Sequence, residues 1–330
     1  MGPTELWSMV SEILGRVSHK RRRDPRFVSR GDYSVWHVLK VILFGVVHRI
    51  SIPSLYRKLE KPGFLRAAGL PNRMISQSQI YKRMSDPMTV RALLELLQQS
   101  AQRALREAGE EEVRILPMDL TAYKSHPDRD PLAAWGFTSG GHFWGYKLGL
   151  ILSKSGLVLG MTLTRGNWTE FTVVARLLRM ARETIRGAFG SAEVHYVVAD
   201  AGFDGEKTYR EAWHQLGAVA LCPARRKRNP KAKSARKILR NARRRCPYRW
   251  RSQTLWKSEE ARQVYRKRNS VEQVNGQIKA VLKIDEIPSR RRGVRRLRLL
   301  SLAKLFIYNC ALYVNIQKGQ PARQIAHLVA

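Results

Sequence analysis

Residues 194–202 read VHYVVADAG, a short apolar run that ends in Asp200 and is followed by a glycine. The pattern predicts a buried strand with a carboxylate just past its carboxyl end, where a turn begins. Residues 113–120, VRILPMDL, form a second apolar run with Asp119 near its end. Since neighbouring parallel strands place their carboxyl ends side by side, we expect the two acids to meet at one edge of a sheet.

The other segments of this region predict the rest of the sheet. Residues 146–152 and 157–164 are apolar runs joined by a Lys-Ser-Gly turn, which indicates a hairpin. Residues 171–185 and 206–216 have helical periodicity, and residues 218–222 read as another short strand. Together these segments predict an α/β fold with a mixed five-stranded sheet and helices on its faces.

The chain outside this region is predicted to be helical. Residues 1–107 form an expected N-terminal all-helical domain, and the polar AGEEE segment that follows is the expected boundary. Within it, residues 51–85 fit a helix-turn-helix with Ser76 or Ser78 as a helix cap, although a plain helical bundle fits equally well. We predict an α/β domain over residues 113–318 and a tail over residues 319–330.

Two apolar runs, residues 36–47 and 301–314, are short and contain polar residues, so they are interpreted as core helices rather than membrane spans. The three cysteines, Cys222, Cys246 and Cys310, have neither disulfide-scaffold nor zinc-ligand spacing. A reducing, intracellular compartment fits this cysteine usage best.

The charge balance points to a polyanionic partner. Lys and Arg number 61 against 26 Asp and Glu, a formal net charge of +35. Nucleic acid is the commonest partner of such a chain. Residues 225–251 hold 14 Lys or Arg and no acid, and residues 290–298 hold six Arg. A solubilising surface is the ordinary alternative, but we expect phosphate contact from the following residues: Arg225, Arg226, Lys227, Arg228, Arg243, Arg244, Arg245, Trp250, Arg290, Arg291 and Arg292.

Four residues near the C-terminus are spaced to share one face of a helix. Tyr265, Arg268, Glu272 and Lys279 would lie within an arc of roughly 60° on a continuous helix. The opposite face would hold Val271, Val274, Ile278 and Val281. A solvated face with ion pairs between neighbouring turns explains the charges equally well.

Asp119, Asp200 and Glu272 each have an ordinary structural interpretation, as a turn residue, a cap or an ion-pair partner. Together they match the need of phosphodiester cleavage, in which two divalent ions activate a nucleophile and neutralise charge. Magnesium prefers such oxygen ligands. The eight histidines show no ligand spacing that would favour zinc. We assign the acids nearby to turns, caps or surface: Asp128, Asp130, Glu170, Asp204 and Asp285.

In this Asp, Asp, Glu order the chain resembles the DDE transposases of bacterial insertion sequences. The spacing of Tyr265, Arg268, Glu272 and Lys279 matches the subgroup defined by a Tyr-Arg-Glu-Lys signature helix. Supporting stretches are GYKL (145–148), TRGN (164–167) and ADAGF (199–203). The resemblance covers about residues 113–315, and the N-terminal region has no comparable motif.

The resemblance implies a ribonuclease H-like catalytic domain in which Asp119, Asp200 and Glu272 hold two Mg²⁺ ions, with Mn²⁺ able to substitute. Tyr265, Arg268 and Lys279 would grip DNA phosphates and terminal nucleotides. Hydrolysis would free a 3′-hydroxyl at the element end, and that hydroxyl would then attack target DNA. The implied partners are double-stranded terminal repeats, target DNA and a second copy of the chain. A bacterial cytoplasmic enzyme at the nucleoid, away from membranes, is expected.

The chain departs from some relatives in the insertion at residues 225–251, which is Arg-rich rather than β-rich. Between the last strand and the signature helix, only Tyr248, Trp250 and Trp256 could stabilise a flipped base, so routes with and without a hairpin intermediate both fit. Two other functions compete with transposition. One is a catalytically idle DNA-binding protein, and the other is a two-metal nuclease without strand transfer.

Overall fold

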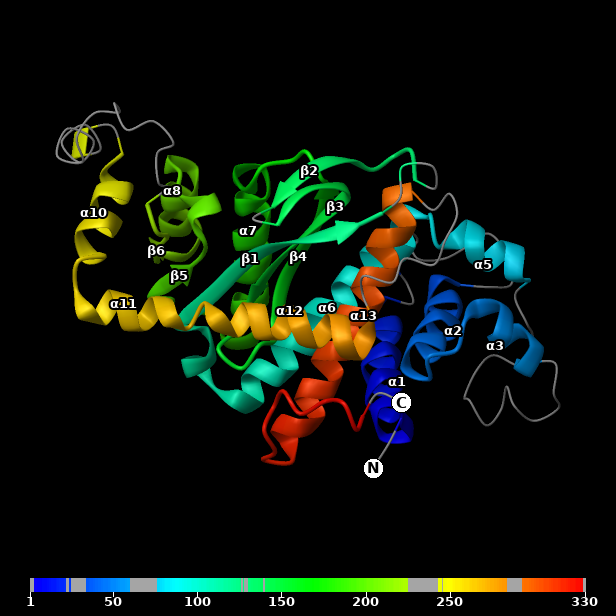
Figure 1. The fold of residues 1–330 in the computed structure, drawn as a ribbon. Helices are drawn as coiled ribbons and strands as arrows, with labels where there is room; N and C mark the ends of the chain where they lie inside the picture. Colours follow the sequence, from blue (N-terminus) through cyan, green and yellow to red (C-terminus); the bar gives the residue numbers. More distant parts are fainter. Residues whose placement is uncertain are drawn as a thin grey trace. The chain divides into compact units, whose positions relative to one another are not determined.

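The computed structural model describes residues 3–21, 24, 34–59, 76–125, 127, 130–138, 140–224, 243–244, 246–283 and 293–328 (Figure 1). The chain divides into two compact units. Unit 1 comprises Met1–Glu107, Ser125–Ala133 and Gln277–Ala330, and unit 2 comprises Ala108–Lys124 and Ala134–Gly276. The domain boundaries expected from the sequence stay a prediction.

Unit 2 is built on a six-stranded mixed sheet with the order β2-β3-β1-β5-β6, and β4 pairs with β3 beside β2. The pairs β1·β3, β2·β3 and β3·β4 are antiparallel, whereas β1·β5 and β5·β6 are parallel. The predicted α/β class and mixed sheet are thereby confirmed. The strands are β1 (Ile115–Lys124), β2 (Ala134–Thr138), β3 (Gly141–Leu152), β4 (Val158–Arg165), β5 (Tyr196–Val198) and β6 (Val219–Leu221).

Strand β2 is an addition to the five strands predicted from the sequence. Its residues Trp135 and Phe137 are 59% and 52% exposed, so β2 is an edge strand whose aromatic side chains face outward. A strand of this kind lacks the buried apolar run from which the other strands were predicted.

Strand β1 is longer than predicted, and Asp119 lies in its middle rather than at its end. Residues 115–117 pair with β5, and residues 118–124 pair with β3. The parallel pairing stops at Pro117, which has no N–H to donate to a neighbour. Asp119 therefore lies two residues past the point where β5 leaves β1, which keeps it near the carboxyl end of β5.

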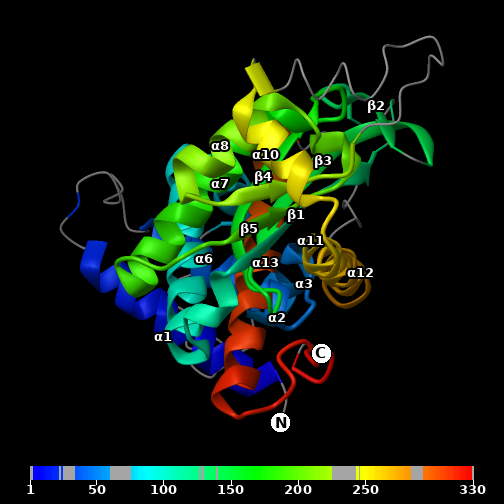
Figure 2. The ribbon, with the colours of Figure 1, turned by 90° about the vertical axis from the view of Figure 1, so that its left-hand side faces the viewer.

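Helices cover both faces of this sheet (Figures 1 and 2). On one face, α7 packs closely on β3 and β4, because Gly149 and Gly160 leave room for Leu177 and Met180 of the helix. On the other face, Ala261 of α11 packs against Val198 and Leu221. The helices are α7 (Glu170–Phe189), α8 (Glu206–Leu216), α10 (Pro247–Leu255), α11 (Glu259–Arg266) and α12 (Asn269–Leu282), with short 3₁₀ helices η1 (Glu110–Val113) and η2 (Ala201–Phe203).

The described residues of unit 1 form helices joined by turns and loops, without a strand. Ser76 accepts a hydrogen bond from the backbone N–H of Gln79 and therefore caps α5. Of the two predicted caps, Ser76 and Ser78, the structure thus identifies Ser76. Residues 60–75 lie outside the described residues, and the helix-turn-helix stays a prediction. The helices are α1 (Pro3–Arg21), α2 (Val35–Val47), α3 (Ile52–Leu59), α5 (Gln77–Arg83), α6 (Pro87–Ala108) and α13 (Gly293–Gln317).

Helix α13 forms the centre of unit 1 and packs against α1 and α2. By length and composition alone it could cross a membrane, but 83% of its most apolar window is buried inside the protein. Burial of this extent is typical of the core helix of a globular domain, in agreement with the interpretation of residues 301–314.

Candidate active site

Asp119 projects from β1 toward the face of the sheet that α11 covers. Side chains alternate along a strand, so Asp119 shares the face of Ile115, which packs against the cluster that contains Ala261 of α11. The Nδ2 of Asn275 on α12 donates a hydrogen bond of 3.1 Å to the Asp119 Oδ2. Burial, followed by the charge of Asp200, raises the pKa of Asp119 to about 6, although the Arg268 guanidinium opposes this rise.

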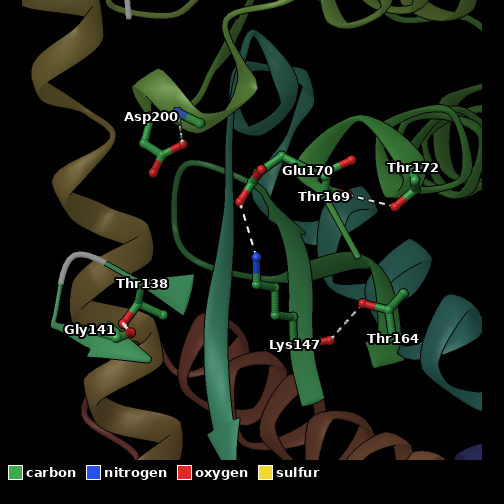
Figure 3. Close-up of polar contacts among 9 residues, drawn as sticks. Thr138, Gly141, Lys147, Thr164, Thr169, Glu170, Thr172 and Asp200 are labelled. Carbon is green, nitrogen blue, oxygen red and sulfur yellow. Dashed lines mark hydrogen bonds and ion pairs between the residues drawn. The ribbon is translucent and has the colours of Figure 1, made fainter. Parts of the chain in front are cut away.

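Asp200 follows β5 and caps η2, with its Oδ1 accepting a 2.9 Å hydrogen bond from the backbone N–H of Gly202 (Figure 3). Burial raises the pKa of Asp200, and the nearby Glu170 carboxylate raises it further. The Arg268 charge and the Gly202 hydrogen bond act in the opposite direction. The structure thus brings Asp119 and Asp200 within electrostatic reach of each other, from strands adjacent in the sheet.

Glu272 on α12 joins these acids through Arg268. The Nη2 of Arg268 lies 2.6 Å from the Oε1 of Glu272, and the guanidinium also interacts with the charges of Asp119 and Asp200. The Arg268 side chain is 20% exposed, whereas that of Glu272 is 55% exposed. Arg268 is therefore the shared counter-charge of all three carboxylates.

The continuous helix expected from Tyr265 to Lys279 is wrong. Helix α11 ends at Arg266 and α12 begins at Asn269. Between them the backbone N–H groups of residues 267, 268, 270 and 271 each donate to the carbonyl three residues earlier. These tighter turns change the rotation between the two helices, so an angle of 100° per residue cannot be carried across the break. The apolar side of α12 is as predicted, because Val271, Val274 and Ile278 are buried.

Tyr265 is less open to a ligand than the spacing predicted. Its ring is half-buried and lies edge-on to Trp256, with 4.7 Å between the ring centroids. Burial raises the pKa of Tyr265, and Arg268 is a close electrostatic partner. Lys279 is half-buried in the part of α12 that belongs to unit 1. The DNA contacts of both residues stay predictions.

The basic insertion is described only in part. Arg243 and Arg244 are exposed, and the Arg243 guanidinium lies 5.4 Å from the centroid of the Trp250 ring. Trp250 is on α10, which packs against α8 and β6. The remaining candidates lie outside the described residues: Arg225, Arg226, Lys227, Arg228, Arg245, Arg290, Arg291 and Arg292.

Asp204 has a larger role than the sequence indicated. Its side chain is fully buried and accepts two hydrogen bonds from Arg249 on α10, at 3.1 and 2.8 Å, and one from the Tyr209 hydroxyl at 2.8 Å. Asp204 thereby ties α10 to the turn that follows Asp200. The local sequence does not predict the Arg249–Asp204 pair, because Arg249 is one of many arginines in the basic block.

The other acids that the sequence analysis assigned to turns, caps or surface have the following positions in the structure. Asp130 accepts a hydrogen bond from the backbone N–H of Leu132, as expected of a turn residue. Glu170 is the first residue of α7 and pairs with Lys147. Asp128 and Asp285 lie outside the described residues.

The donor set fits a hard divalent cation in its chemistry. Three carboxylates gather in a partly desolvated place where Asp119 and Asp200 resist ionisation, and a cation would relieve both the burial and the repulsion. Among the described residues, however, no three acidic, His or Cys side chains are close enough together to hold a metal ion. The Arg268 guanidinium instead interacts with the charge of each of the three acids.

Comparison with known proteins identifies the family of the chain. The family model described as transposase DDE domain matches residues 114–310, which is more than half of the chain. No match was found among curated proteins or among solved structures. The mixed sheet with its flanking helices is that of a ribonuclease H-like domain.

Proposed function

The chain belongs to the transposase DDE domain family, and on this premise we propose that it binds the ends of an insertion sequence, cleaves them and joins the freed 3′-hydroxyl to target DNA. The observation that carries the proposal is the gathering of Asp119, Asp200 and Glu272 around Arg268. Three acids from β1, the end of β5 and α12 would otherwise be an unfavourable concentration of like charge.

We assign the binding of two Mg²⁺ ions to Asp119, Asp200 and Glu272, and Mn²⁺ is expected to substitute. When bound, such ions activate the attacking oxygen and stabilise the leaving oxygen of an in-line displacement. Asn275 restrains the Asp119 carboxylate through its amide hydrogen bond. The Gly202 N–H restrains Asp200 in the same way. These contacts hold two of the three carboxylates in place before any ligand arrives.

Arg268 has a second task in this proposal. In the metal-free chain its guanidinium is the counter-charge of the acids, and in the DNA complex it would leave them, since bound cations would neutralise the same carboxylates. The guanidinium is then released toward a backbone phosphate, which it can bind through two parallel hydrogen bonds. Tyr265 and Lys279 are proposed to contact the same DNA end.

The net charge of +35 supports a double-stranded DNA substrate, with terminal repeats and target DNA as the two binding partners. We propose that two copies of the chain act together in the DNA complex, and that the enzyme works at the nucleoid of a bacterial cytoplasm. Among the described residues of the basic insertion, Arg243 and Arg244 are exposed and can contact phosphate.

The test compares wild type with Glu272→Gln on a duplex that carries a transposon end, with cleavage and strand joining measured separately in Mg²⁺. We expect loss of both activities, because the substitution removes one metal-binding carboxylate while preserving its shape. Glu259→Gln is the matched control, since Glu259 is an exposed acid on α11. Equal cleavage by wild type and Glu272→Gln would refute the site. Cleavage by wild type without joining would identify a nuclease instead, and DNA binding without cleavage would identify an idle relative.

A further inference from the structure

A fourth carboxylate, that of Glu170, lies beside Asp200. Glu170 opens α7, after the expected cap position Thr169, and its carboxylate contributes to the electrostatic environment of Asp200 (Figure 3). The two side chains meet at Gly202. A methyl group at Gly202 would lie 2.8 Å from the Asp200 Oδ1 and 3.2 to 3.3 Å from the Glu170 side chain. Glu170 therefore abuts the turn in which Asp200 is held.

Lys147 fixes Glu170 in this position. The Lys147 Nζ lies 3.4 Å from the Glu170 Oε1, and the two side chains are only 10% and 21% exposed. Lys147 belongs to β3, and its backbone is flanked by β1 and β4. An ammonium group so far inside a sheet is costly to desolvate unless it is paired, so the pair holds Glu170 against β3.

An acid in the first turn of a helix has an ordinary explanation, because it interacts favourably with the helix dipole. That explanation accounts for Glu170 by itself. It does not account for the ion pair between Glu170 and the buried Lys147. It also does not account for the close packing of Glu170 on the Asp200 turn. The second of these features places Glu170 beside Asp200, one of the proposed metal ligands.

We propose that Glu170, held by Lys147, is a positioning residue that strengthens divalent-cation binding by Asp119 and Asp200. Glu170 supports the Asp200 turn by contact, and its negative charge acts on the Asp200 carboxylate. It is not itself a metal ligand in this proposal. The inference rests on the proposed function, since it presumes that these acids bind metal. Groups that orient metal ligands in this manner typically change metal affinity by about 10- to 100-fold.

The test is direct titration of the full chain with Mn²⁺ alone, followed by calorimetry, so that no turnover is needed. We expect Glu170→Gln to bind Mn²⁺ about tenfold more weakly than wild type. Glu183→Gln, which removes an exposed acid from the same helix, should bind as wild type. Glu170→Asp keeps the charge and should recover most of the affinity, which a purely structural role would not require.

Two further variants separate the possible failures. Asp119→Asn should lose Mn²⁺ binding, and wild-type affinity in that variant would refute the proposed metal site as a whole. Loss of binding in Asp119→Asn with wild-type affinity in Glu170→Gln would overturn only the role of Glu170. If Glu170→Gln does not fold, Gly202→Ala decides the matter. It preserves every charge but crowds Glu170 against Asp200, so unchanged Mn²⁺ affinity would overturn the inference.

Discussion

Replacing Asp119 by Asn should stabilise the metal-free chain near neutral pH. A pKa that rises from 3.8 in the unfolded chain to about 6 in the folded one means that folding favours the protonated carboxyl. The difference of about 2.2 pKa units corresponds to about 3 kcal/mol at about 1.4 kcal/mol per unit. The protonated Asp119 carboxyl therefore contributes to the stability of the folded chain. This stabilisation is fully present below pH 3.8 and is lost as the pH rises through about 6. Asn does not titrate, and its amide oxygen can still accept from Asn275.

The assay is urea unfolding in the presence of a chelator at pH 4 and pH 7.5. The difference between variant and wild type cancels the contribution of the titrating groups that do not interact with Asp119. We expect similar free energies of unfolding at pH 4, and a variant that is more stable by up to about 3 kcal/mol at pH 7.5. Glu183→Gln, which removes an exposed acid, should show no such change with pH. Excess Mg²⁺ at pH 7.5 should then stabilise wild type and leave Asp119→Asn unchanged.

Two results would refute this reasoning. If Asp119→Asn were destabilised equally at both pH values, the side chain would act through its hydrogen bonds rather than through the cost of its charge. If Mg²⁺ stabilised both proteins equally, the cation would bind elsewhere on the chain.

Two further predictions concern the scaffold around the site. Arg249→Met leaves the buried Asp204 carboxylate without its cation, so we expect a loss of about 3 to 5 kcal/mol in the free energy of unfolding. The exposed pair of Arg262 offers the control, since Arg262→Met should cost at most about 1 kcal/mol in the same urea titration. Gly145→Ala would place a methyl group 2.1 Å from a backbone carbonyl of β1, so we expect severe destabilisation or failure to fold, measured by thermal unfolding. Gly276→Ala on α12 is the control, because its added methyl group would lie in open space, and the change should be neutral or stabilising by about 1 kcal/mol. Equal effects of the two glycine substitutions on thermal unfolding would contradict the close packing of β1 and β3.

Local periodicity predicted the elements that have a regular apolar pattern. Helix α8 spans the residues predicted for it, and the buried strands β4 and β6 begin and end within about one residue of their predicted bounds. The edge strand β2 was missed because its aromatic side chains point to solvent instead of forming an apolar run. The break between α11 and α12 was missed because residues 267 and 268 carry no proline or glycine to signal it.

The sequence alone determined which chemical groups are present and how they are spaced. Apolar runs that end near acids and an excess of basic residues predict a mixed α/β sheet and a polyanionic partner, whereas the ribonuclease H-like class is implied by the resemblance of the Asp, Asp, Glu order and the signature pattern to DDE transposases. These properties depend on neighbours a few residues apart, which is the range over which helical and strand periodicity acts.

Only the tertiary structure decided how those groups interact. That Arg268 serves three carboxylates, that Asp119 resists ionisation and that Lys147 holds Glu170 behind Asp200 are consequences of packing β1, β3, β5, α7 and α12 together. Burial and Coulomb energy depend on the distance between side chains that are far apart in the chain. Spacing along the sequence therefore cannot supply them.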